Sequence, residues 1–157
     1  MMPGFGEDHF INLLVTQYTL ESELEKMKEE LVFRCPDFNT VVGFRLFRPS
    51  YDRTKNLTDV NIKHAFSSLG VNLSDANAKL ILKRYDSDRD GEVTFSDICD
   101  IFKPKDPALA KEFQRRLPFD HKKSEQDLQY ETKAYLRTLF HKTLQVEQNI
   151  ELLKLEL

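Results

Sequence analysis

The twelve residues from Asp86 to Asp97 constrain this chain more than any other stretch of its sequence. Their sequence is DSDRDGEVTFSD, with aspartate at the first, third and fifth positions and glycine at the sixth. Carboxylates at alternate positions can converge on one point, and Ca²⁺ is a hard cation that takes about six to eight oxygen ligands. Glycine at the sixth position permits the positive φ that a sharp bend requires. The spacing predicts a cation-binding loop rather than a plain acidic turn.

Six residues of this loop are candidate metal ligands, because each can offer an oxygen to the same point. They are Asp86, Asp88, Asp90, Glu92, Thr94 and Asp97. Glu92 would contribute its backbone carbonyl, and Thr94 would contribute its hydroxyl directly or through a water molecule. Val93 is expected to point inward and to pair through a short β-bridge with a partner loop.

Apolar periodicity predicts helices before and after the loop. Ser74 is expected to start the helix that leads into the loop, and Pro104 to stop the short helix that follows it. Asp37 and Thr58 are expected to cap two earlier helices, because their side-chain oxygens accept the orphan amide hydrogens of a first turn. Gly70 stands where a left-handed residue would end the second of these helices.

These features resemble the paired EF-hand unit of the calmodulin and centrin superfamily, over residues 36–104. The resemblance implies a first hand at Phe38–Leu69 and a second hand at Ser74–Phe102. The second loop, residues 86–97, keeps the metal-binding pattern, whereas the first loop is degenerate. The resemblance therefore implies a mostly α fold in which only one of two hands binds a cation.

The first loop departs from the family pattern at several positions. Arg48 stands where the first aspartate belongs, and no glycine appears at the bend. Aligning Leu57 with Val93 as the bridge residues requires extra residues in this loop. A cation there would meet Arg48, Arg53 and Lys55 rather than a ring of carboxylates. The first hand is therefore expected to be free of metal and to serve as the packing partner of the second.

The second loop departs from the pattern at its last position, where Asp97 replaces glutamate. A bidentate glutamate supplies two oxygens, whereas the shorter aspartate reaches the ion less well. Fewer ligands favour six-coordinate Mg²⁺ over the larger Ca²⁺, or weaken the binding of both. We expect one divalent site, for Ca²⁺ or Mg²⁺.

Two long amphipathic segments flank the hands. Residues 1–35 repeat apolar side chains in steps of three and four, and residues 124–157 repeat them at heptad spacing. Ser124 and Asp127 have the signature of a capping box, so the second of these helices is expected to begin at Ser124. Residues 105–123, between the hands and this helix, form a basic connector that contains prolines.

The two terminal segments also resemble each other. Leu13–Leu31 aligns with Leu139–Leu157 without a gap, and Glu21 then matches Glu147. Two heptad helices rich in glutamate and leucine also match by chance, so a tandem repeat and a single unit both remain open. In either case each terminal helix is expected to lie against a neighbour.

Composition excludes several classes of protein. The chain has 23 Lys+Arg and 26 Asp+Glu, a net charge of -3, which argues against a nucleic-acid-binding protein. No apolar run is long enough to span a bilayer, and residues 1–10 lack the apolar core of a secretory signal. Cys35 and Cys99 form no CxxC pair and are expected to be reduced. No nucleophile with its base and no phosphate-binding glycine loop is apparent, so we expect a cytoplasmic or cytoskeletal protein that is not an enzyme.

A narrower resemblance comes from the residues around the hands. The sequences Asp37–Asn39 and Arg84–Asp86, set between a Glu-rich helix and a heptad helix, are similar to those of EF-hand repeat proteins of cilia and flagella. Some of these proteins sit on or inside the doublet microtubules of the axoneme. The resemblance implies a structural component whose terminal helices bind tubulin or other axonemal proteins. The basic connector is either a solvated linker or a contact with an acidic surface such as that of tubulin.

The alternative is a regulatory calcium sensor. Such a protein opens a hydrophobic groove for a target helix when Ca²⁺ rises. The residues that would line the groove are Phe38, Phe44, Phe47 and Phe66. A sensor gains steepness from two coupled sites, and here one loop is degenerate, so the sequence favours the structural role.

Overall fold

The structure is a computed structural model that describes residues 5–48, 56–116 and 128–157. The described residues form seven helices, which confirms the prediction of a mostly α fold. The helices are α1 (Phe5–Arg34), α2 (Thr40–Phe47), α3 (Asp59–Ser68), α4 (Asp75–Tyr85), α5 (Phe95–Phe102), α6 (Pro107–Arg115) and α7 (Tyr130–Leu155). Within these ranges, none of the helices has the length and apolar character needed to cross a membrane.

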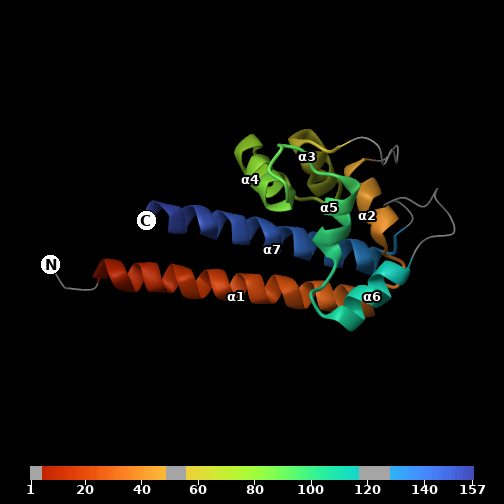
Figure 1. The fold of residues 1–157 in the computed structure, drawn as a ribbon, viewed down its shortest axis with the longest axis horizontal. Helices are drawn as coiled ribbons and strands as arrows, with labels where there is room; N and C mark the ends of the chain where they lie inside the picture. The colour runs from red at the N-terminus through yellow and green to blue at the C-terminus, as the bar shows by residue number, and fades with distance from the viewer. Residues whose placement is uncertain (1–4, 49–55, 117–127) are drawn as a thin grey trace.

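The two long helices, α1 and α7, lie side by side and run in opposite directions (Figure 1). The start of α1 faces the end of α7, where His9 Nε2 lies 3.4 Å from Glu156 Oε1. Further along, the Tyr135 hydroxyl of α7 donates to the Met27 carbonyl of α1 at 3.2 Å. The four short helices α2–α5 pack over α7, and α6 lies near the end of α1.

The apolar stripes of the two long helices pack against each other. Leu24 and Leu31 of α1 and Leu139 and Val146 of α7 are all buried. Asn149 Nδ2 adds a hydrogen bond to the Leu13 carbonyl at 3.0 Å. The two terminal helices therefore pack on each other within the chain, and the expected contact of each with a neighbour in an assembly stays a prediction.

Phe140 of α7 joins the long helices to the short ones. Its ring stacks on that of Phe66 with centroids 4.1 Å apart, and it also contacts Phe47 and Phe102 at 6.2 and 6.3 Å. All four rings are fully buried. Offset and edge contacts between aromatic rings add to the free energy of burial. Aromatic side chains of α2, α3 and α5 thus surround Phe140 of α7.

The prediction that Asp37 caps α2 is wrong. Asn39 is the cap, and its Oδ1 accepts a hydrogen bond from Val42 N at 3.0 Å. The Asp37 carboxylate instead accepts from Gln129 N at 3.0 Å and from the Thr132 hydroxyl at 2.6 Å. Asp37 therefore stabilises the first turn of α7 rather than its own helix.

Within the described residues, the last helix, α7, begins at Tyr130, and Leu128 and Gln129 before it are not helical. Ser124 and Asp127, the expected capping box, lie outside the described residues, so the predicted start at Ser124 stays a prediction. The bond between Asp37 and the Gln129 amide explains the actual start, because it satisfies an amide that no side chain of the helix itself reaches.

Other local predictions are confirmed. Ser74 Oγ accepts from Asn77 N at 3.1 Å and caps α4. Thr58 precedes α3, where its amide donates to Asn61 Oδ1 at 3.0 Å. Gly70 follows α3 with a φ of +84°, the left-handed conformation that ends many helices.

Replacing Phe140 with alanine tests how strongly α7 is held. Phe140→Ala should lower the free energy of unfolding by about 3–5 kcal/mol, because it leaves a cavity among three buried rings. Leu155→Ala is the matched control on the same helix, since Leu155 is 82% exposed. Urea denaturation followed by circular dichroism measures both values. Equal stability of the two variants would contradict the packing described.

Candidate metal centre

The turn between α4 and α5 contains the predicted metal-binding loop. Helix α4 ends at Tyr85, and α5 begins at Phe95. Gly91 has a φ of +86°, which is the positive angle that the sequence predicted at the sixth position. Arg89 also has a left-handed φ, of 59°, which is uncommon for a residue with a side chain. The sharp bend is therefore made at two positions.

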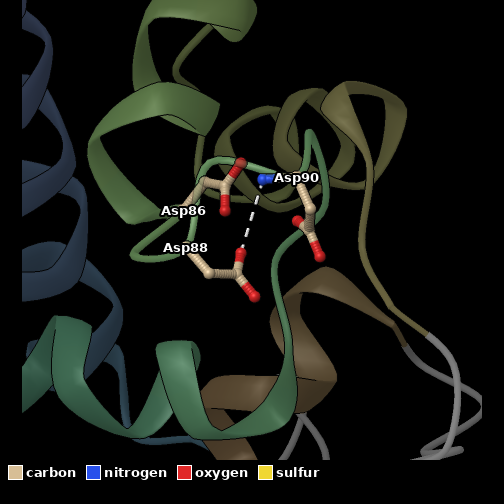
Figure 2. A group of neighbouring side chains, drawn as sticks. All are labelled: Asp86, Asp88 and Asp90. Atoms are coloured by element: carbon tan, nitrogen blue, oxygen red, sulfur yellow. Dashed lines mark hydrogen bonds between the residues drawn. The ribbon is translucent and has the colours of Figure 1, made fainter.

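Three aspartates gather inside this bend (Figure 2). Asp86, Asp88 and Asp90 each offer one carboxylate oxygen, and these oxygens all lie within 4.8 Å of one another. Two oxygens that bind one Ca²⁺ at about 2.4 Å can be no more than about 5 Å apart. The three oxygens are therefore close enough to bind one and the same cation.

Hydrogen bonds to the backbone hold these carboxylates in place. Gly91 N donates to Asp86 Oδ2 at 2.7 Å, and Glu92 N donates to Asp90 Oδ1 at 2.9 Å. A longer bond of 3.4 Å joins Asp90 N to Asp88 Oδ1. Such local bonds fix the shape of a turn. The loop therefore presents its carboxylates in a defined arrangement.

The other oxygen of Asp86 has no such partner. Asp86 is 8% exposed, and its Oδ1 is buried without a hydrogen-bond donor among the described residues. A buried acceptor that lacks a donor is unfavourable, so such atoms point to a missing ligand or water. A cation among the three carboxylates would supply the missing interaction.

The three carboxylates also crowd one another electrostatically. Burial opposes the charge of Asp86, yet backbone hydrogen bonds from Gly91 and its neighbours hold its pKa below the ordinary value. The pKa of Asp88 is raised, chiefly by the adjacent carboxyl of Asp86 and by burial, and the nearby Asp90 adds to the effect. Neighbouring carboxylates raise one another's pKa because like charges repel. A divalent cation would relieve this repulsion.

The other predicted ligands make different contacts. Asp97 Oδ2 accepts from Thr94 N at 3.0 Å, and Asp97 Oδ1 accepts from the Ser87 hydroxyl at 2.6 Å. Thr94 Oγ1 accepts in turn from Asp97 N, so this pair forms the capping box of α5. The Glu92 side chain accepts from Asn56 Nδ2 at 2.8 Å. The structure thus brings together the carboxylates of three of the six predicted residues. The side chains of Thr94 and Asp97 bond to each other's amides, and the predicted contribution of the Glu92 backbone carbonyl stays a prediction.

The predicted bridge ties the loop to the segment that precedes α3. Leu57 and Val93 form an antiparallel β-bridge with N–O distances of 2.7 and 2.9 Å, and both are fully buried. Arg48 Nη2 donates to the Asn56 carbonyl at 3.3 Å across the ends of the first loop. Arg53 and Lys55 lie outside the described residues, so a metal-free first loop remains a prediction.

The sequence did not predict the contacts of Arg84, which lies two residues before Asp86. Arg84 Nη2 donates to Glu21 of α1 at 2.8 Å, and Arg84 Nη1 donates to Glu147 of α7 at 3.1 Å. The bonds from Arg84 lower the pKa of Glu21, whereas deeper burial raises the pKa of Glu147. The one signal in the sequence was the alignment of Glu21 with Glu147. This guanidinium fixes the start of the loop to both long helices.

Comparison of the chain with models of protein families, with curated proteins and with solved structures finds no match. The assignment of the metal centre therefore depends on the residues of this chain.

Replacing Asp97 with glutamate tests the role of the last loop position. The Thr94 hydroxyl can still accept a hydrogen bond from the backbone amide of residue 97, so α5 should keep its cap while the glutamate carboxylate is free to bind the ion. Asp97→Glu should raise the affinity for Ca²⁺ by about tenfold, because a bidentate carboxylate adds an oxygen, and should change Mg²⁺ binding less. Calorimetric titration measures both affinities. Asp100→Glu, on the exposed side of α5, is the control, and an equal effect of the two variants would contradict the prediction.

Proposed function

We propose that this chain is an EF-hand protein that binds one divalent cation and acts as a structural component of a larger assembly. The observation that carries the proposal is the buried Asp86 Oδ1 without a donor, next to Asp88 and Asp90. The arrangement of α2–α3 and α4–α5, joined by the Leu57–Val93 bridge, supports a pair of EF-hands. The ion would be Ca²⁺ or Mg²⁺.

The packing of α7 favours a structural role over that of a sensor. A sensor opens a hydrophobic groove to a target helix when Ca²⁺ binds. Here Phe140 of the chain's own α7 already occupies the space between Phe47, Phe66 and Phe102. A target helix would have to displace α7, which is also held through Glu147 and Arg84. The cation would then stiffen one loop of a closed unit.

Calorimetric titration with Ca²⁺, alone and against about 1 mM Mg²⁺, tests ion binding. Asp86→Ala should abolish binding and leave the helical content unchanged, because Asp86 lies in the turn and not in a helix. Asp100→Ala removes an exposed carboxylate close to the loop and should bind as the unchanged chain does. Failure of the unchanged chain to bind either ion would contradict the proposal.

The same samples distinguish a structural role from that of a calcium sensor. A dye that binds exposed apolar surface should show no increase in fluorescence when the site fills with Ca²⁺. Amide hydrogen exchange around Phe140 should stay slow in both states. A strong increase in dye fluorescence with faster exchange in α7 would instead support a calcium sensor.

The assembly that we propose is the doublet microtubule of the ciliary axoneme, with tubulin or another axonemal protein as the partner. Since the stripes of α1 and α7 bury each other, a partner would meet the outer face of α1. That face carries the exposed side chains of Ile11, Leu14, Val15 and Tyr18, which are 45% to 76% exposed. A tagged copy in ciliated cells should follow the axoneme. A diffuse signal that spares the cilium would contradict this assembly without affecting the metal site.

A further inference from the structure

A basic groove lies between the end of α3 and the first half of α7. Its volume is about 570 Å³, and α7 contributes Lys133, Arg137 and His141 to its lining. Ser68 and Leu69 at the end of α3 form the other side. Among the described residues that line this groove, none is acidic. The formal charges of the described lining residues are therefore those of Lys133 and Arg137, both positive.

The charges in this groove are not neutralised within the described part of the chain. Two other basic residues of α7, Lys142 and Lys154, form ion pairs with glutamates. Lys133, Arg137 and His141 form none with any described residue. The uncompensated bases of α7 are thus gathered on one face. A surface of one sign attracts a partner of the opposite sign.

The spacing of these bases indicates the shape of the partner. Residues four apart on a helix lie on one face, about 6 Å from each other along the axis. In an extended peptide, alternate side chains point to the same side and are about 6.6 Å apart. Acidic side chains at every second position of an extended strand therefore match Lys133, Arg137 and His141 one to one.

We propose that this groove binds an extended acidic peptide segment of a partner protein, with acidic residues at alternate positions. The guanidinium of Arg137 is the central contact, because it can donate two parallel hydrogen bonds to one carboxylate. The guanidinium lies beside Gly70, where a Cβ would be in ordinary contact at 3.6 Å from the guanidinium carbon.

Tyr130 adds an apolar contact at the edge of the groove. Its side chain is 84% exposed, and tyrosine is enriched at protein interfaces. A long polyanion such as a nucleic acid fits less well, because the chain has a net charge of -3 and the groove holds only a short row of bases. A short acidic segment can pair with the basic side chains of the groove without approaching the acidic residues elsewhere on the surface.

Fluorescence anisotropy with the full chain tests this site. The probe is a labelled peptide in which glutamate and serine alternate, and its partner probe has glutamine in place of every glutamate. The glutamate peptide should bind, and its affinity should fall when NaCl is raised from about 50 mM to about 300 mM. Arg137→Glu should weaken binding by about tenfold and Arg137→Gln by less. Binding of the glutamine peptide with equal affinity would overturn the proposal.

Lys111→Glu on α6 is the matched control, because Lys111 is exposed and the net charge changes equally. It should leave the affinity within about twofold of the unchanged chain. Circular dichroism shows whether each variant keeps its fold. If Arg137→Glu does not fold, the affinity of Arg137→Gln is compared with that of the unchanged chain instead. Equal effects of Arg137→Glu and Lys111→Glu would overturn the proposal. Single-stranded DNA that binds as tightly as the peptide and loses affinity with Arg137→Glu would overturn the assignment to a peptide.

Discussion

The insertion of Phe140 between the short helices is the contact on which the remaining packing depends. Phe140 stacks on Phe66 and touches Phe47 and Phe102, so one side chain of α7 contacts three other helices. The other side of α7 packs along α1. Because α7 is shared in this way, the short helices and the long helices form one core rather than two.

The candidate metal centre is attached to this core through the residues on either side of it. Arg84 at the end of α4 holds Glu21 and Glu147, one on each long helix. Val93 within the loop pairs with Leu57, which precedes α3. The loop is therefore anchored at both ends, and a cation among its carboxylates would stiffen a turn whose surroundings are already packed. The structural role that we propose, rather than that of a switch, draws on this arrangement.

The parts of the fold that the sequence predicts are those in which the signal is local. Three aspartates at alternate positions can gather in one turn, and the φ of Gly91 follows from its place in that turn. The sequence did not predict the contacts between distant residues. Asp37 has the chemistry of a helix cap, but the start of α7, 92 residues away, binds its carboxylate. Asp97 has the chemistry of a ligand, yet the amide of Thr94 competes for the same oxygen.

The most direct test of the metal centre is a crystal structure grown with Mn²⁺, which scatters anomalously and accepts the oxygen ligands that Ca²⁺ and Mg²⁺ prefer. Our account predicts an anomalous peak between the carboxylates of Asp86, Asp88 and Asp90, with Asp86 Oδ1 in contact with the ion. An empty loop, in which a donor from the protein satisfies Asp86 Oδ1, would contradict it.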